Sequence, residues 1–250
     1  IEVGRSVEGR ARRALDYGRM RLAFHEHTGA PLPDGQAERM ASWGRGRADI
    51  TQDDDEDPVA IVDLWDVRNL RHLTQAATLT HRHPAALAIR QETQILYANQ
   101  ARVRPPRELA WALAMFVYSL EPPARPEVEF GADARRGQRV FRRQCHRCHR
   151  NDNGSGPPVD AHDVGTDPAL AFGRARGTGV YRPSPLVRVA DAAPYLHDGT
   201  VPTLEALLSE DRFAPDYAGP RGIGPVVGHR YGLALPAPER DALLAYLRAL

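Results

Sequence analysis

The two cysteines of this chain constrain its fold more than any other feature. They are the only cysteines in 250 residues, and they stand in the sequence Cys145-His146-Arg147-Cys148-His149. This Cys-x-x-Cys-His spacing is typical of covalent haem c attachment, in which each thiol forms a thioether with one vinyl group of the porphyrin. The histidine that follows then reaches the iron as its proximal ligand. We therefore predict that Cys145, Cys148 and His149 bind one covalent haem c.

A disulfide, a zinc site and a chance occurrence are the alternatives to haem attachment at this motif. A thioredoxin-like redox pair needs a βαβ context, which the sequence pattern does not show. A zinc site needs two further ligands at finger-like spacing. His162 could supply one of them, but the chain has no second cysteine pair. The residues that flank the motif favour haem over these alternatives.

Helical patterns on both sides of the motif predict a cytochrome c-like fold. Apolar residues recur at helical spacing over residues 134–144, and this predicted helix ends at the motif. Its small Gly137 would permit close contact with another helix. A second amphipathic helix is predicted over residues 239–250, after a pair of prolines. The fold class is thus expected to be mainly α, with a cytochrome c haem-binding domain over residues 132–250.

The first half of the chain contains no cysteine, but it shows a weak internal repeat. Residues 106–120 resemble residues 236–250, which lie 130 positions later. A proline-rich segment over residues 121–131 then has the composition of a linker between domains. We predict that residues 1–121 form a second, degenerate cytochrome c-like helical domain that lacks a haem motif.

Elimination favours a histidine as the distal ligand, because a six-coordinate haem c usually takes Met or His opposite the proximal histidine. The chain has no lysine, and no methionine follows Cys148. The histidines downstream of the motif are His162, His197 and His229. His162 follows a stretch rich in glycine and proline and is expected in a loop.

Two further segments resemble a known superfamily. The sequence Pro194-Tyr195-Leu196-His197-Asp198-Gly199 resembles an element that follows the C-terminal haem of bacterial di-haem cytochrome c peroxidases, which group with MauG and RoxA proteins. Gly228-His229-Arg230-Tyr231-Gly232 is similar to the RoxA-like branch. The resemblance is specific over residues 132–250 and weak before them.

This resemblance implies roles for several residues near the haem. In the peroxidases the histidine of the first element lies near the haem, and a methionine fourteen positions later is the distal ligand. That position is Asp211 here. In RoxA-like proteins the histidine of the Gly-His element is similar to a distal ligand. The resemblance therefore implies His229 as distal ligand, with His197 or an open or tyrosine-ligated iron as alternatives, and it adds Tyr195 to the candidate haem-binding residues.

Other candidate cofactor contacts follow from residue chemistry. Arg182 or Arg188 is the expected partner of a haem propionate, because a guanidinium suits a carboxylate bidentately. The acidic run of residues 53–57 is a possible calcium site, since a calcium ion lies between the haem domains in the peroxidase family; the alternative is a solvated loop. His81 and His83 are either exposed loop residues or relics of a cofactor site. Relatives carry two haem domains, so either the first haem has been lost or its motif lies upstream of Ile1.

Net charge and hydropathy limit which classes of partner this chain is expected to bind. The net charge is +1, which gives no reason to expect nucleic acid binding. No apolar run approaches the roughly 18–20 residues of a membrane span. Arginines gather around the motif, which predicts either a docking face for an acidic redox partner protein or a solvated helix face. They are Arg135, Arg136, Arg139, Arg142, Arg143, Arg147 and Arg150.

These observations predict an electron-transfer cytochrome, in which a bis-histidine iron cannot bind peroxide or dioxygen without losing a ligand. A bis-histidine haem is expected to have a low to moderate potential. The first alternative is a haem oxidoreductase, either a di-haem peroxidase or an oxygenase of the MauG or RoxA type. The second is a haem-bearing subunit of a larger redox complex. Because haem c is attached outside the cytoplasmic membrane, we expect a periplasmic or extracellular-facing location.

Overall fold

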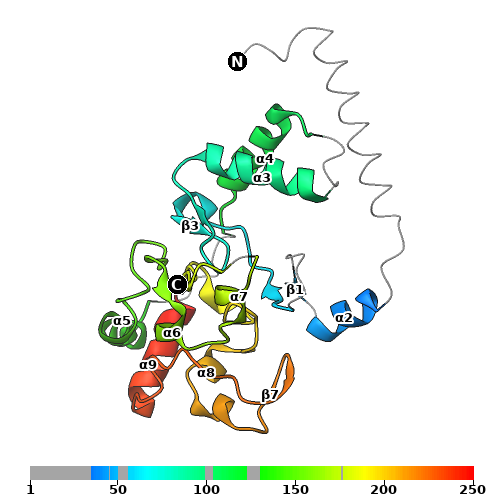
Figure 1. The fold of residues 1–250 in the computed structure, drawn as a ribbon. Helices are drawn as coiled ribbons and strands as arrows, with labels where there is room; N and C mark the ends of the chain where they lie inside the picture. The colour runs from blue at the N-terminus through cyan, green and yellow to red at the C-terminus, as the bar shows by residue number, and fades with distance from the viewer. Residues whose placement is uncertain (1–34, 45, 50–55, 99–103, 123–129, 176) are drawn as a thin grey trace. The chain divides into compact units, whose positions relative to one another are not determined.

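The computed structural model describes residues 35–44, 46–49, 56–98, 104–122, 130–175 and 177–250 (Figure 1). The chain divides into two compact units. Residues 1–37 and 81–120 make up the first unit, and residues 38–80 and 121–250 make up the second. These units differ from the two predicted segments, because residues 38–80 group with the half of the chain that carries the haem motif.

The described part of the first unit is a pair of packed helices, α3 (Pro84–Ala98) and α4 (Arg107–Ser119). Helix α4 begins directly after Pro106, whose fixed φ suits a helix start. Its buried residues recur at helical spacing and are Ala110, Ala114 and Val117. Helix α2 (Gln36–Trp43) begins in this unit and continues into the second.

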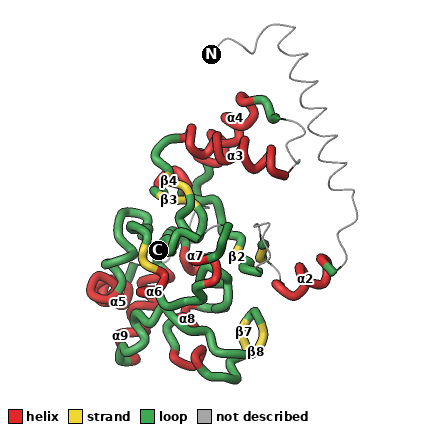
Figure 2. Tube along the Cα trace, viewed as in Figure 1, coloured by secondary structure: helices red, strands yellow, loops and turns green. Residues whose placement is uncertain are grey.

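The second unit contains short elements around two longer helices. The helices are α5 (Ala132–Gln144), α6 (Ala161–Val164), α7 (Ala169–Phe172), α8 (Leu204–Leu207) and α9 (Ala237–Arg248). The 3-10 turns are η1 (Val67–Asn69), η2 (Val189–Asp191) and η3 (Glu210–Phe213). Long loops join these elements (Figure 2).

The strands of this unit form antiparallel pairs of two residues each. They are β1 (Arg47–Ala48) with β2 (Val59–Ala60), β3 (His72–Leu73) with β4 (Leu79–Thr80), β5 (Val159–Asp160) with β6 (Val180–Tyr181), and β7 (Ala218–Gly219) with β8 (Gly222–Ile223). In the β5–β6 register, Val159 lies opposite Tyr181 and Asp160 lies opposite Val180. The described residues are therefore mainly helical where they are regular, as predicted.

Helices α5 and α9 pack directly against each other, as Figure 1 shows. Gly137 permits this approach, since a Cβ atom there would lie 1.9 Å from the carbonyl oxygen of Ala242. Helix α9 starts after Pro236 with a second proline in its first turn, which favours helix initiation. Both predicted helices are confirmed, with ends that differ from the prediction by about two residues.

The main hydrophobic core of the second unit lies between these two helices and the loops that follow the motif. Its buried side chains are Val140, Phe141, Val189, Tyr195, Val201, Leu204, Leu208, Leu235, Leu243, Leu244, Tyr246 and Leu247. Cys145 packs against the same cluster, so the haem motif is anchored at the edge of the core. Within the described ranges, no helix combines the length and apolarity needed to cross a bilayer.

Candidate haem site

The cysteine motif forms a tight turn at the C-terminal end of α5. The backbone N–H groups of Cys145 and His146 both donate to the carbonyl of Phe141, at 2.8 and 3.1 Å. The N–H groups of Cys148 and His149 then donate to the carbonyl of Cys145, at 3.2 and 3.0 Å. This helical winding places the two thiols three positions apart on one side of the turn. Both cysteines are free and half-buried.

The Cys145 thiol lacks the lowered pKa that is typical of a redox-active cysteine pair. Burial, with a smaller contribution from Cys148, raises the pKa of Cys145 to about 11. Catalytic cysteine pairs have lowered pKa values, because the thiolate is the reactive species. In addition, the described residues contain no group of three or more His, Cys, Asp or Glu side chains that could hold a metal ion. The zinc alternative therefore finds no support in this part of the chain.

His149 is oriented by the loop that follows the motif. Its Nδ1–H donates to the carbonyl oxygen of Gly154 at 3.0 Å, which leaves Nε2 as the nitrogen able to bind a metal. Desolvation lowers the pKa of His149 below its ordinary value, so the imidazole is neutral at neutral pH. A neutral, oriented imidazole is the form required of a proximal haem ligand.

His229 faces His149 from the loop that precedes α9. Their ring centroids lie 6.4 Å apart, with an angle of 67° between the ring planes. The pKa of His229 is lowered to about 4, chiefly by desolvation, with smaller contributions from His149 and Arg212. Its Nδ1 atom is buried and has no hydrogen-bond partner among the described residues. The fold thus brings together two neutral imidazoles, one of which retains unused hydrogen-bonding capacity.

These residues fit a haem by geometry and by donor chemistry. Metal–nitrogen bonds of about 2 Å on each side would separate the centroids of two imidazoles on one iron by roughly 6 Å. The separation of His149 and His229 agrees with this value. Cys145 and Cys148 supply the two thiols required by the vinyl groups. The same four residues would hold the haem.

His197 lies in a different environment from His229. It is buried and stacks on Tyr181, with ring centroids 4.4 Å apart, and its Nε2 lies 3.3 Å from the tyrosine hydroxyl. Its carbonyl accepts a hydrogen bond from the N–H of Ala60 at 2.9 Å. Burial lowers the pKa of this histidine as well. Its surroundings are therefore those of a packed structural residue, and its ring is engaged by Tyr181.

Tyr195 contributes to the core beside this segment. Its hydroxyl donates to the carbonyl of Val189 at 2.9 Å, and its backbone pairs with Val201. Burial, followed by the negative charges of Glu205 and Asp191, raises the pKa of Tyr195 to about 12. The Tyr195 hydroxyl is therefore bonded to a backbone group of the core.

The two arginines expected near a propionate have different surroundings. Arg188 forms an ion pair with Asp191. Arg182 is buried, and its Nε donates to the carbonyl of Thr74 at 3.1 Å, while its Nη1 has no partner in the described part of the chain. Burial lowers the pKa of Arg182 to about 10, against the opposing effect of Asp63. Arg182 thus retains an unused, buried donor.

The remaining predicted cofactor residues are only partly described. Residues 53–55 of the acidic run lie outside the described ranges; Glu56 accepts a hydrogen bond from the indole of Trp43, and Asp57 is buried. His81 is buried in the first unit against the hydroxyl of Tyr118, rather than exposed in a loop. The ring of His83 lies beside that of Trp111.

Arg212 is a site residue that sequence reasoning missed. It is fully buried, and its guanidinium donates to carbonyls of the loop that carries His229. All 33 basic residues of the chain are arginines, so no sequence signal distinguishes this one from its solvent-exposed neighbours.

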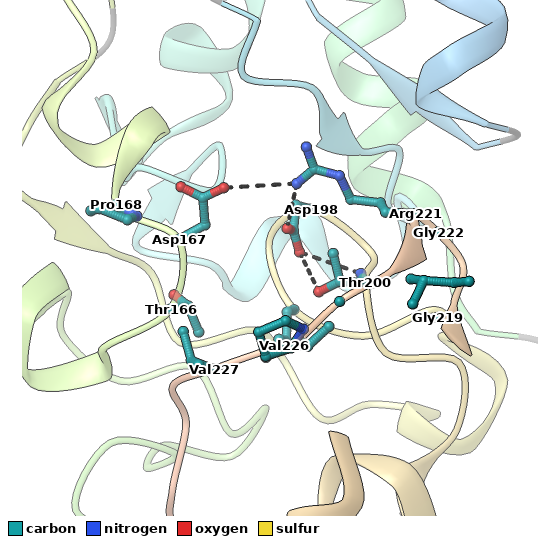
Figure 3. A pocket seen from close by; sticks show the side chains of 14 residues that line it. Thr166, Asp167, Pro168, Asp198, Thr200, Gly219, Arg221, Gly222, Val226 and Val227 are labelled. Carbon is teal, nitrogen blue, oxygen red and sulfur yellow. Dashed lines mark hydrogen bonds and ion pairs between the residues drawn. The ribbon is translucent and has the colours of Figure 1, made fainter. Parts of the chain in front are cut away.

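A cavity of about 360 Å³ lies beside the same loop and is lined by Val226 and Val227. Figure 3 shows Asp167 and Asp198 directed toward Arg221, whose Nη1 lies 3.7 and 3.0 Å from their carboxylate oxygens. Neither His149 nor His229 lines this cavity. It is therefore distinct from the space between the two imidazoles.

The helix that ends in the Cys-x-x-Cys-His turn packs against α9, and His149 of that turn lies opposite His229. This arrangement is typical of a cytochrome c-like fold. Comparisons with known proteins agree with this class. The family model described as RoxA-like, cytochrome c-like matches residues 180–215.

A solved structure, the crystal structure of a MauG-like protein associated with microbial copper homeostasis, is similar to this chain with a TM-score of 0.51 and 20% sequence identity. The similarity covers 83% of this chain and 77% of that one. Among curated proteins, none matches. The family match lies within the region where the sequence resembles RoxA-like proteins, and the solved structure agrees with this chain in fold.

Proposed function

We propose that this protein is an electron-transfer cytochrome with one covalent haem c, held by Cys145 and Cys148 and ligated by His149 and His229. The observation that carries this proposal is the opposition of the two neutral imidazoles, with centroids 6.4 Å apart. The cytochrome c-like relationship independently implies a haem c. His197 is a weaker candidate for the distal position, because its ring stacks on Tyr181.

The bound haem would supply a one-electron iron couple, whose potential is tuned by its axial ligands and surroundings. The chain's own residues would hold both axial positions. The Gly154 carbonyl fixes the tautomer of His149, and desolvation keeps both imidazoles unprotonated. With His149 and His229 as ligands, a bound haem would offer no open position to peroxide or dioxygen. This arrangement suits electron transfer better than oxygen chemistry.

Arg182 is the better of the two propionate candidates in this proposal. Its Nη1 is buried without a partner among the described residues, whereas Arg188 is paired with Asp191. A propionate would satisfy this donor and neutralise a buried charge.

The surface around the motif supports docking of an acidic redox partner. Arg136 and Arg143 are engaged by the carbonyl of Pro238 and by Glu239. Further basic side chains beside the motif are exposed to solvent, namely Arg139, Arg142, Arg147 and Arg150. Positive charge near a haem attachment site would steer encounter with an acidic partner. Since haem c is attached outside the cytoplasmic membrane, we propose a periplasmic or extracellular-facing location.

A second candidate function is supported by the MauG-like structural neighbour. A haem oxidoreductase of the peroxidase or oxygenase type would require an exchangeable ligand on the iron and, by analogy with di-haem relatives, a second haem. We also propose that residues 1–121 derive from a degenerate cytochrome c-like domain, because residues 106–120 resemble residues 236–250 in sequence. Such a domain would be either a docking module within a larger redox complex or a former haem domain that has lost its haem.

The reactivity of the ferric protein separates the two functions. We expect a low-spin optical and electron paramagnetic resonance spectrum that does not change when cyanide or hydrogen peroxide is added. Rapid cyanide binding by the wild-type protein, or turnover of peroxide with an electron donor, would instead establish the oxidoreductase. The reduced protein should return its electron to a small one-electron oxidant in either case, which provides a control for intact haem.

A further inference from the structure

Arg212 is the residue most closely connected to the loop that carries His229. It lies in η3, and its side chain is fully buried. Its Nη1 donates to the carbonyl of Val226 at 2.5 Å, and its Nη2 donates to the carbonyls of Gly228 and His229 at 2.6 and 3.1 Å. A single guanidinium therefore binds three carbonyls within four consecutive residues.

The hydrogen bonds of this buried cation all go to the backbone. Its Nε also reaches a carbonyl, that of Leu207, at 3.4 Å. Within the ranges that the structure describes, the hydrogen-bond partners of Arg212 are all backbone carbonyls and none is a carboxylate. Burying a charged group costs free energy unless its N–H donors are hydrogen-bonded. The carbonyls of the loop satisfy the donors of Arg212, so the loop conformation and the buried guanidinium stabilise each other.

The opposite side of the loop is held by residues 164–166. The N–H of His229 donates to the carbonyl of Val164 at 2.7 Å. Gly228 has a φ of +86°, and a Cβ atom there would lie 2.3 Å from the backbone nitrogen of Thr166. His229 itself has a φ of +42°, in the left-handed region that non-glycine residues rarely adopt. The loop is thus fixed between Arg212 on one side and this segment on the other.

A cation–π stack extends the attachment of the loop to η3. The guanidinium carbon of Arg212 lies 4.4 Å from the centre of the Phe213 ring, and that of Arg230 lies 4.7 Å from the same ring. Arg230 directly follows His229, so the residues on both sides of the histidine are tied to η3.

We propose that Arg212 is a positioning residue that holds His229 in place and thereby sets how slowly the distal position opens. This inference rests on the proposed function, in which His229 is the distal ligand of the haem. Arg212 would act through the three carbonyls of this loop. Loss of these charge-assisted hydrogen bonds should accelerate ligand exchange by at least about tenfold.

The test uses haem-loaded protein and the rate of cyanide binding to the ferric iron, together with its spin state. Arg212→Gln should bind cyanide at least about tenfold faster than wild type and should gain a high-spin fraction. Arg212→Lys, which retains the charge but not the planar fork, should lie between the two. Gly228→Ala disturbs the loop from its other side and should act like Arg212→Gln. If Arg212→Gln does not accumulate as folded protein, Gly228→Ala and Arg212→Lys still test the proposal.

Arg47 provides a matched control, because it is also buried and also binds backbone carbonyls, those of Trp43 and Gly199. Arg47→Gln should leave the cyanide rate unchanged. The proposal is overturned if Arg212→Gln and Gly228→Ala keep the wild-type rate and spectrum, or if Arg47→Gln accelerates binding equally. A His229→Ala variant separates the two levels: if its spectrum equals that of wild type, the proposed ligation itself is wrong, whatever Arg212 does.

Discussion

His229 and His197 are the two candidates for the distal position, and the surroundings of their rings differ. His229 presents a neutral ring to His149 and carries a buried nitrogen without a partner in the described residues. His197 is stacked on Tyr181 and lies within hydrogen-bonding reach of its hydroxyl. A ring already held by a neighbour must break that contact before it can bind a metal.

Removal of each histidine should therefore give different spectra. We expect His229→Ala to convert the ferric haem from low spin to high spin, because one axial ligand is lost. His197→Ala should remain low spin, although it loses the packing of a buried ring. Optical and electron paramagnetic resonance spectra of both purified variants measure this difference. A high-spin His197→Ala protein beside a low-spin His229→Ala protein would reverse the assignment.

The buried hydroxyl of Tyr195 predicts how the folding stability changes at alkaline pH. Burial raises its pKa from 10.0 to about 12, so the folded state favours the neutral phenol. The resulting stability is fully present below pH 10, the unfolded value, and is lost as the pH rises through 12. Tyr195→Phe removes both this pH dependence and the hydrogen bond to Val189.

We expect Tyr195→Phe to be less stable than wild type by about 1 kcal/mol at pH 8. This difference in the free energy of unfolding should shrink between pH 10 and 12. In that range the unfolded wild-type protein loses the phenolic proton while the folded protein keeps it, whereas Tyr195→Phe has no such proton. Denaturant unfolding of the haem-loaded proteins at a series of pH values measures it. A difference that stays constant through this range would show that Tyr195 does not titrate as described.

At the scale of single residues, the sequence predicts the haem-attaching motif better than it predicts the distal ligand of the iron. The spacing of Cys145, Cys148 and His149 follows from the chemistry of the porphyrin, so the motif alone indicates their role. The distal ligand depends on which loop returns to the haem, and the sequence narrows that choice without deciding it. Arg212 could not be predicted, because burial of one arginine among 33 is a property of the fold.

The crossing of α5 and α9 is the element-level feature on which the haem site depends. It fixes the end of α5, where Cys145 begins the attachment turn. At the crossing, a Cβ on Gly137 would lie 1.9 Å from the carbonyl oxygen and 2.5 Å from the carbonyl carbon of Ala242. Because these are backbone atoms, a change of side-chain rotamer cannot relieve the overlap.

Gly137→Ala should therefore destabilise the protein despite the better helix propensity of alanine. Propensity favours alanine by about 1 kcal/mol, whereas overpacking against a rigid backbone costs about 3 kcal/mol or more. We expect a net loss of at least about 2 kcal/mol in the free energy of unfolding, measured with denaturant. Arg139→Ala, on the exposed face of the same helix, should change it by less than about 0.5 kcal/mol. Equal stability of Gly137→Ala and wild type would contradict the close crossing.

Helices α5 and α9 were predictable because their apolar residues repeat at a helical period over about three turns. The strand pairs were not, because two residues are too few to show alternation. The grouping of residues 38–80 with the second unit was also beyond sequence reasoning. It depends on contacts such as that between Arg182 Nε and the carbonyl of Thr74, which join residues 108 positions apart.

At the scale of the whole molecule, the number of haems distinguishes the proposed functions. The second unit contains the one Cys-x-x-Cys-His motif of the sequence, and the first contains no cysteine at all. An electron-transfer cytochrome needs one haem only. A di-haem oxidoreductase would need a second haem that is bound without thioethers from this chain.

The most direct test of the central claim is to count covalent haems per chain. The protein is matured in cells that attach haem c, extracted with acidified acetone, and analysed by pyridine haemochrome absorbance and intact mass. We predict one haem per chain that survives extraction, and none in a protein with both Cys145→Ser and Cys148→Ser. A colourless extracted chain with two titratable thiols would contradict the account.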